Sequence, residues 1–237
     1  KDHQINLRYL PGIELPENVR PETDLAKCLN GANDVLICVP SYALREILTT
    51  VEPLIDQDTR VCWATKGFEL STGQLPHQIA SEILGDQRLV AVLSGPTFAM
   101  EVGKGLPTAI AVAASNKRYA EEIATLLSNN NFRAYTSGDM IGVEVGGAVK
   151  NVLAIAAGVS DGLGFGANTR IALITRGLAE MTRLGVAIGA QPETFMGLSG
   201  IGDLVLTCTD DQSRNRRLGL LLATGKSIES AQLEIGQ

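Results

Sequence analysis

The sequence predicts an α/β fold, in which a mainly parallel sheet covered by helices is followed by an all-helical half. From residue 35 onward, short runs of β-branched and other apolar residues alternate with stretches in which apolar residues recur every three or four positions. After about Ser137 the β-branched runs stop, and long segments rich in Ala, Leu and Gly keep only the helical spacing. Continuous apolar strands that alternate with helices are typical of a parallel sheet covered on both faces.

The elements of the first half follow one another in a regular order. The expected strands are residues 35–39, 60–64, 89–93, 109–113 and 132–135, and the expected helices between them are residues 42–51, 75–84 and 118–127. In the second half the clearest expected helices are residues 143–158, 169–184 and 215–223. Gly185 is placed where a glycine commonly ends a helix, so we expect the middle one to stop at Leu184.

Composition excludes several classes of protein. The 237 residues, 45% of them hydrophobic, are enough for one large or two modest domains. A formal charge of −6 disfavours general nucleic-acid or membrane-surface binding, because such proteins usually carry a basic excess. Four scattered cysteines and two histidines disfavour a zinc site or a disulfide framework and favour a reducing compartment. The apolar stretch 145–159 is interrupted by Lys150 and Asn151, which indicates a buried helix rather than a membrane span.

Two charged residues of the helical half lie among small and apolar neighbours. Lys150 follows Gly146 and Gly147, and burial there would disfavour its charged form and lower its pKa toward the range of an acid or base. A lysine that reaches solvent from a helix edge is the alternative. Asp203 lies in a similar setting, where it can pair with a lysine such as Lys150 or cap a helix. Asn151 could orient a hydroxyl or carbonyl group.

A basic segment opens the last expected helix. Ser213 is a plausible N-cap residue, and Arg214, Arg216 and Arg217 follow it. Free amides at a helix start and guanidinium groups together favour a phosphate or carboxylate ligand. A solvated basic face is the alternative.

Two segments follow neighbouring expected strands of the first half. Ser94 to Ala99 comes directly after one strand, with Thr97 as a candidate N-cap, and Lys66 comes after another. The carboxyl ends of parallel strands are where open α/β sheets bind ligands, although each segment alone can be a structural turn. The only glycine triple of nucleotide-binding type, Gly162, Gly164 and Ala167, has no strand before it, so we expect a loop between two helices.

These same residues carry a resemblance to a known family. The chain resembles the bacterial NAD(P)-dependent glycerol-3-phosphate dehydrogenases in motifs that occur in order through essentially its whole length: residues 62–69, 93–99, 145–152, 160–169, 173–181, 200–209 and 213–217. The resemblance implies a Rossmann-like dinucleotide-binding domain over residues 1–136 and a helical substrate domain over residues 137–237. It also implies NAD or NADP as cofactor, and hydride transfer between that cofactor and dihydroxyacetone phosphate or sn-glycerol 3-phosphate, with no metal.

The resemblance also implies a role for each site residue. Lys150 would be the proton acceptor in oxidation and the donor in reduction. Lys66 would contact both substrate and cofactor, and Ala99 and Arg214 would approach the cofactor. The substrate would also be bound by Gly95, Thr97, Asp203, Ser213, Arg214 and Asn215.

Two expectations limit these implications. The family begins with a Gly-rich βαβ unit that holds the cofactor and ends with further helices, so this sequence is expected to be an incomplete form. A non-catalytic fragment that binds a phosphorylated ligand therefore stays open, as does a related two-domain dehydrogenase of another phosphorylated substrate or hydroxy acid. The resemblance implies a cytoplasmic enzyme of phospholipid synthesis with a small-molecule substrate, without nucleic-acid or integral membrane contact, and a homodimer is one assembly it allows.

Overall fold

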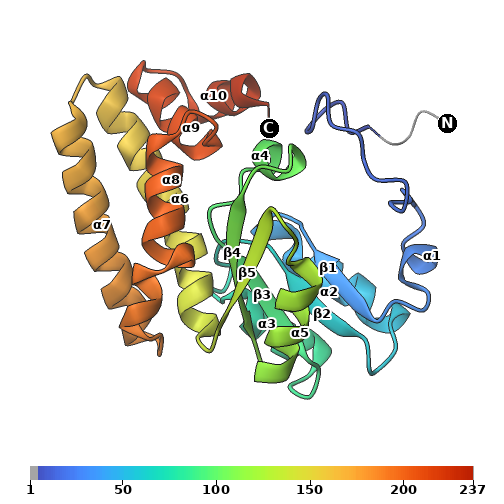
Figure 1. Cartoon of the computed structure of the whole chain (residues 1–237). Coiled ribbons are helices and arrows are strands. Elements are labelled where there is room, and N and C mark those ends of the chain that lie inside the picture. Colours follow the sequence, from blue (N-terminus) through green and yellow to red (C-terminus); the bar gives the residue numbers. More distant parts are fainter. Residues whose placement is uncertain (1–4, 237) are drawn as a thin grey trace.

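A five-stranded sheet forms the centre of the first half of the chain (Figure 1). The computed structural model describes residues 5–236. The strands are β1 (Asp34–Ile37), β2 (Arg60–Trp63), β3 (Val90–Ser94), β4 (Thr108–Ala114) and β5 (Phe132–Ser137), and they lie in the sheet in this order. The pairs β1–β2, β2–β3 and β4–β5 are parallel, whereas β3 and β4 are antiparallel. The expected α/β class with a mainly parallel sheet is confirmed.

Helices cover both faces of this sheet. α2 (Leu44–Val51) and α3 (Pro76–Leu84) cover one face, and α5 (Lys117–Leu127) covers the other. The first half also has two short helices, α1 (Leu25–Leu29) and α4 (Ala99–Gly103). Alternate residues of β2 point to opposite faces. Val61 and Trp63 pack with residues of α2 and α3 in one core cluster, whereas Cys62 packs with Tyr119 of α5 in another.

A long buried helix, α6 (Met140–Gly162), organises the second half. The other elements are α7 (Ala167–Ala187), the 3-10 helix η3 (Pro192–Met196), the π-helical segment η4 (Leu198–Gly202), α8 (Asp203–Thr209), α9 (Arg214–Ala223) and α10 (Ile228–Ile235). Helix α6 is long and apolar enough to cross a membrane by length and composition alone, but here α7, α8 and α9 pack around it. The expectation of a buried helix is confirmed.

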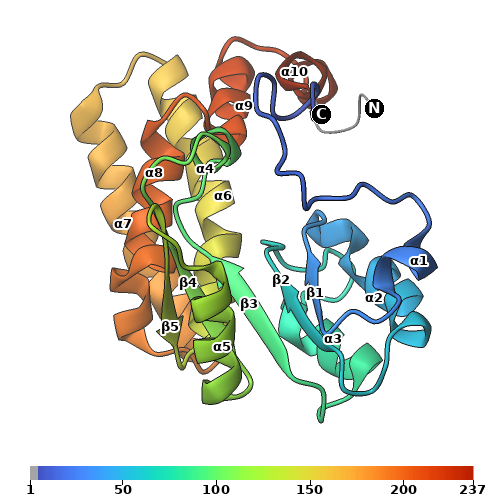
Figure 2. The ribbon, with the colours of Figure 1, turned by 45° about the vertical axis from the view of Figure 1, so that its right-hand side comes forward.

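The two halves meet along β4, β5 and α6. In the sheet, β5 lies on the side of the helical half and β1 lies farthest from it (Figure 2). Helix α6 also contacts β3 and β4, and Val143 at its start belongs to the same core cluster as Trp63. The first turns of α6 are therefore part of the sheet's own core, which fixes the position of the residues farther along the helix.

Two local expectations are wrong. Helix α7 continues past Gly185 to Ala187. Gly185 makes room for a neighbouring ring instead of ending the helix, since a Cβ there would be 2.1 Å from Phe195 Cζ. Thr97 is not an N-cap, since Phe98 occupies that position and the Thr97 hydroxyl donates to the Gly95 carbonyl at 3.3 Å. The glycine triple near Gly164 lies at the loop between α6 and α7, as expected.

Candidate active site

Two lysine side chains from different halves of the chain meet at one carboxylate, that of Asp203. Lys150 of α6 donates from Nζ to Oδ1 of Asp203 at 2.5 Å, and Lys66 donates to Oδ2 of the same residue at 2.7 Å. Lys150 Nζ also donates to Thr207 Oγ1 at 3.1 Å, and Lys66 Nζ donates to the Gly95 carbonyl at 3.1 Å. The structure therefore brings together four of the residues singled out in the sequence, from both halves of the chain.

The Lys150 amine is largely removed from solvent, since its side chain is only 9% exposed. Burial lowers its pKa to about 8, and the nearby Lys66 cation lowers it as well, while Asp203 acts in the opposite direction. An amine with a pKa near neutral pH can both take up and release a proton during a reaction. The environment of Lys150 is therefore that of an acid–base group.

Glycines let α6 approach the rest of the site. A Cβ on Gly146 would lie 2.2 Å from the Ser199 carbonyl oxygen, and a Cβ on Gly147 would lie 2.9 Å from Ser94 Oγ and 3.2 Å from Lys66 Cγ. Such distances are shorter than van der Waals contact, so a larger residue would push the helix away. Lys150 follows Gly147 by one turn, and this close approach brings its amine within reach of Asp203.

The start of α9 forms a second polar group beside the first. Ser213 is the N-cap of α9 and accepts a hydrogen bond from the Arg216 amide, as expected. Asn215 donates to Oδ1 of Asn151 at 2.8 Å, and Asn151 directly follows Lys150 on α6. This bond ties the expected anion-binding segment to the helix that carries the lysine.

The arginines of this segment have different roles. Arg216 is buried and donates to Asp161 at 2.7 Å from Nη2, and it also pairs with Asp211. Its charge is therefore balanced inside the protein. Arg214 is exposed and has no ion pair among residues 5–236, so its guanidinium group is available to an anion.

The expected residues after β3 lie at the boundary of the two halves. Ala99 begins α4, and Glu101 of that helix accepts a hydrogen bond from Gln212 at 2.8 Å, just before Ser213. The start of α4 and the start of α9 are thus neighbours across the boundary (Figure 1). Ser94 Oγ is buried beside Gly147 and has no hydrogen-bond partner within the described part of the chain.

One site residue was not predicted from the sequence. Thr207 accepts from Lys150 and also donates to the Asp203 carbonyl at 2.6 Å. It follows Asp203 by four residues, the spacing that places two side chains on one helix face, and this spacing could have indicated it once a helix was expected there.

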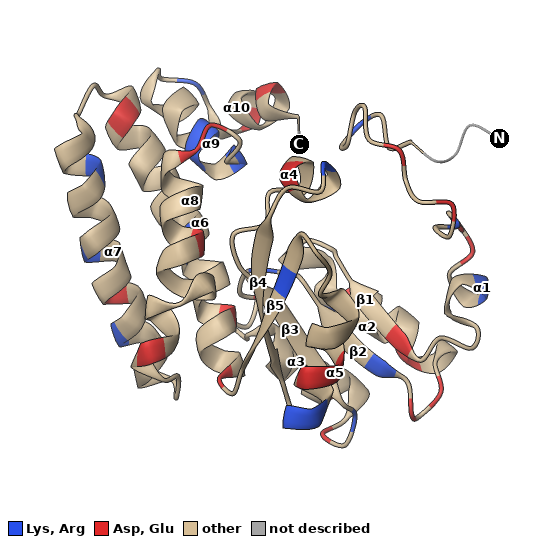
Figure 3. Ribbon diagram, viewed as in Figure 1, with Lys and Arg blue, Asp and Glu red and all other residues tan. Residues whose placement is uncertain are grey.

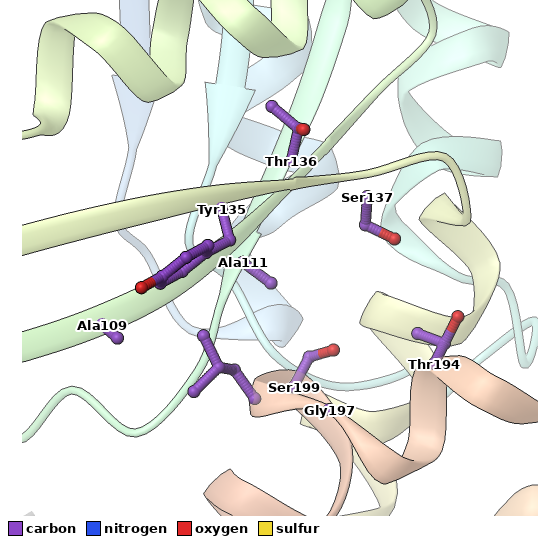
Figure 4. A pocket seen from close by; sticks show the side chains of 9 residues that line it. Ala109, Ala111, Tyr135, Thr136, Ser137, Thr194, Gly197 and Ser199 are labelled. Carbon is purple, nitrogen blue, oxygen red and sulfur yellow. The ribbon is translucent and has the colours of Figure 1, made fainter.

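A cavity elsewhere is lined by none of the residues predicted as site residues from the sequence. It has a volume of about 500 Å³ and lies between β4, β5, η3 and η4 (Figure 4). Its lining consists of Ala109, Ala111, Tyr135, Thr136, Ser137, Thr194, Gly197, Leu198 and Ser199. No lysine, arginine, histidine or carboxylate lines this cavity.

Comparison with known proteins identifies the family. A family model described as "NAD-dependent glycerol-3-phosphate dehydrogenase N-terminus" matches residues 1–120, and the corresponding C-terminus model matches residues 139–237. The chain belongs to the glycerol-3-phosphate dehydrogenase family. A glycerol-3-phosphate dehydrogenase [NAD(P)+] of Psychromonas ingrahamii is 57% identical over 233 residues, which are 98% of this chain and 70% of that protein.

Solved structures of glycerol-3-phosphate dehydrogenases have the same fold. The enzyme from Coxiella burnetii matches with a TM-score of 0.96 and 50% identity, over 99% of this chain and 71% of that one. The enzyme from Dunaliella salina matches with a TM-score of 0.91 and 28% identity, over 99% of this chain and 42% of that one. The Rossmann-like first half and the helical second half are therefore those of the glycerol-3-phosphate dehydrogenases.

Proposed function

We propose that this protein transfers hydride between NAD(P)H and dihydroxyacetone phosphate, and in the reverse direction oxidises sn-glycerol 3-phosphate. The observation that carries the proposal is the buried Lys150 amine, which shares the Asp203 carboxylate with Lys66 in a chain of the glycerol-3-phosphate dehydrogenase family. A nonspecific cationic surface does not account for this arrangement, because both lysines converge on one nearly inaccessible carboxylate.

The residues present fit the nicotinamide end of a dinucleotide. The segments after β2 and β3 reach the same edge of the sheet, where ligands of α/β sheets bind, and Lys66 projects there beside Gly95. Lys66, Ala99 and Arg214 would hold this part of the cofactor. When bound, NAD(P)H supplies the hydride, and no metal is needed beside a positioned lysine. Within residues 5–236 no Gly-rich turn joins a strand to a helix.

Lys150 moves the proton that accompanies the hydride. In oxidation its neutral amine accepts the proton of the C2 hydroxyl, and in reduction its ammonium donates a proton to the carbonyl oxygen. Asp203 and Thr207 orient the amine through their hydrogen bonds, and Asp203 can also bind a substrate hydroxyl. Burial lowers the pKa of Lys150, and the charge of Lys66 lowers it further.

The start of α9 would bind the substrate phosphate. Ser213, Arg214 and Asn215 offer a hydroxyl, an unpaired guanidinium group and an amide at the positive end of a helix. The Asn215–Asn151 bond fixes this segment relative to Lys150. Gly95 and Thr97 would border the substrate on the opposite side, next to Lys66.

A substrate panel tests the proposal. The purified full-length protein is mixed with NADPH or NADH and with dihydroxyacetone phosphate, unphosphorylated dihydroxyacetone, other sugar phosphates or 2-keto acids, and cofactor oxidation is followed at its absorbance band. We expect turnover with dihydroxyacetone phosphate far above that with all other substrates. Turnover that prefers a keto acid or another sugar phosphate would favour a different two-domain dehydrogenase. Binding of the phosphorylated ligand without turnover would favour a non-catalytic protein.

The pKa of Lys150 predicts a pH dependence of opposite sign in the two directions. Because its ammonium donates the proton in reduction, kcat for dihydroxyacetone phosphate should be constant at low pH and fall as the pH rises through about 8. In oxidation the neutral amine is needed, so kcat should rise through the same range. Steady-state rates at saturating substrate on both sides of this pH check the prediction. Profiles with the same sign in both directions would contradict it.

Arg214→Ala tests the phosphate assignment. Loss of the unpaired guanidinium group should raise KM for dihydroxyacetone phosphate at least about tenfold, since a charge-assisted hydrogen bond contributes about 1.5–3 kcal/mol. The unphosphorylated ketone should lose far less, so discrimination between the two substrates should shrink. Arg118→Ala, which removes an exposed arginine of α5, serves as the control. Undiminished discrimination in the Arg214 variant would refute the assignment.

Further properties follow from the same proposal. We propose the boundary between the dinucleotide-binding and substrate domains at residues 136 and 137. This proposal is supported by the end of the last strand, β5, at Ser137, shortly before α6 begins at Met140. A cytoplasmic location is supported by four free cysteines. Small-molecule substrates are supported by the net charge of −6 and by the basic residues, which are scattered among acidic ones along the ribbon (Figure 3). We propose no integral membrane contact. A homodimer is one assembly that the family resemblance allows, and size-exclusion chromatography tests it.

A further inference from the structure

A second buried carboxylate lies outside the group that handles the proton. Glu144 is in the second turn of α6, and its side chain is 0% exposed. It accepts hydrogen bonds from the Trp63 indole Nε1 at 3.0 Å and from the His77 amide at 3.0 Å, and its other oxygen lies 2.5 Å from His77 Nδ1. Burial raises the pKa of Glu144, and its hydrogen bonds with His77 and Trp63 act in the opposite direction.

The partners of Glu144 belong to the sheet half of the protein. Trp63 is the fully buried last residue of β2, and Lys66 follows it by three residues. His77 is in the first turn of α3, where backbone amides have no partner within their own helix and a negative charge is favoured. Glu144 therefore joins α6 to the end of β2 and to the start of α3. Burying a carboxylate is unfavourable unless it is hydrogen-bonded. Here the hydrogen bonds of Glu144 connect the three elements in a fixed orientation.

Three residues of α6, each three positions after the last, contact Trp63, Lys66 and Asp203 in turn. Glu144 binds Trp63, Gly147 faces the stem of Lys66, and Lys150 binds Asp203. Residues three apart form one ridge on a helix surface. A rotation or shift of α6 relative to β2 would therefore move all three contacts together, and the bonds of Glu144 oppose such a movement.

We propose that Glu144 is a positioning residue for the reaction, which acts through Trp63 and β2 to keep Lys66 beside Lys150 at their shared carboxylate, Asp203. This inference rests on the proposed function only for the activity measurements below. Misplacing a reacting group by about 1 Å can cost about 10²-fold in rate, so even a small shift of Lys66 should be measurable.

The position of Lys66 also determines how readily Lys150 loses its proton. The groups that face the Lys150 amine are Lys66 after β2 and, from α8, Asp203, Thr207 and Cys208. Burial lowers the pKa of Lys150, the charge of Lys66 lowers it further, and Asp203 raises it. If β2 moves away while α8 stays against α6, the effect of Lys66 weakens first, and Lys150 should titrate at a higher pH.

Glu144→Ala tests this inference in the full-length protein. We expect kcat for dihydroxyacetone phosphate to fall by about tenfold or more, with a much smaller change in KM, because the phosphate-binding segment lies on α9 and does not contact Glu144. The pH midpoint of kcat should move upward. Glu144→Gln keeps an oxygen that can accept from Trp63 and His77, so it should recover most of the activity. Glu121→Gln on the exposed surface of α5 is the matched control.

A second readout does not depend on activity. The reactivity of the Lys150 amine toward an acylating reagent, measured by mass spectrometry against pH, reports its protonation directly, and its midpoint should be higher in Glu144→Ala than in the unchanged protein. Trp63→Phe is the alternative if Glu144→Ala does not fold. It removes only the indole donor and keeps an aromatic ring in the core. It should raise both the pH midpoint of kcat and that of Lys150 reactivity.

The outcomes are distinct. A destabilised Glu144→Ala protein with unchanged kcat, pH midpoint and Lys150 reactivity would show that Glu144 is only structural and would overturn the inference. If the protein without any substitution does not reduce dihydroxyacetone phosphate, the proposed function is refuted. In that case the Lys150 reactivity of the variants still decides whether Glu144 positions the two lysines.

Discussion

Lys150→Ala is expected to lower kcat in both directions by about 10²- to 10⁴-fold, the range that a positioned acid–base group contributes. Among the described residues, the only other lysine that donates to Asp203 is Lys66. Lys66 projects from the opposite half and also donates to the Gly95 carbonyl. Cofactor affinity should change little, since Lys150 lies on α6 and the expected cofactor residues lie on other elements. Steady-state kinetics and a cofactor titration monitored by fluorescence measure the two effects.

Two further variants separate proton transfer from charge and packing. Lys150→Arg keeps a cation of similar length that does not release its proton, so it should be nearly as inactive as the alanine variant. Small primary amines added to Lys150→Ala should restore part of the rate, and restoration should increase with the fraction of neutral amine in the oxidation direction. Lys117→Ala, at an exposed position of α5, is the control. Turnover like that of the unchanged protein in Lys150→Ala would eliminate the assigned role.

Gly219→Ala is expected to damage both stability and substrate binding. A Cβ at this position would lie 2.1 Å from the Ile155 carbonyl oxygen and 2.7 Å from the Val159 amide nitrogen, so it would collide with the backbone of α6. Neither helix can relieve the collision by a side-chain rotation, and overpacking of this kind typically costs about 1–3 kcal/mol or more. Because α9 carries Ser213 and Asn215, its displacement should also raise KM for dihydroxyacetone phosphate.

Urea unfolding of purified variants measures the first effect, and steady-state kinetics measures the second. Gly138→Ala is the matched control, because a Cβ there would meet nothing within 4 Å and its φ is not in the left-handed region. Gly158→Ala should resemble Gly219→Ala, since its Cβ would lie 2.0 Å from the Arg216 carbonyl oxygen on the same contact. A Gly219 variant as stable as the control would show that α6 and α9 can separate without cost.

Much of the fold could be predicted because it depends on local pattern. Alternating β-branched runs and helical spacings located all five strands to within about two residues, and these patterns reflect which faces must be buried. The short helix α1 was not expected, since a helix of five residues shows little more than one turn of periodicity. For α4 the sequence indicated only a start near Thr97, one residue before the actual N-cap, Phe98. The prediction that α7 ends at Leu184 is wrong because a sequence does not distinguish a glycine that ends a helix from one that makes room for a neighbouring ring.

The site was predicted in part. The small and apolar neighbours of Lys150 indicated a desolvated amine, and its burial confirms that expectation. Two alternatives for Asp203, pairing with a lysine or capping a helix, could not be separated, because its partner lies 53 residues away in the sequence. Three arginines near Ser213 likewise looked equivalent. Within residues 5–236, Arg216 pairs with Asp161 at the end of α6 and with Asp211, whereas Arg214 has no ion pair.

The sequence by itself determined the fold class, the order of the elements, the family and the residue types of the site, since these depend on composition, periodicity and motifs that neighbouring residues carry. The tertiary structure decided which charges meet, which glycines admit a backbone and which carboxylate joins the two halves. Ion pairs such as Lys150–Asp203 and the bonds of Glu144 depend on distances of a few ångströms between segments far apart in the chain. No local pattern encodes those distances, because they result from how α6 packs against the sheet, α8 and α9 at once.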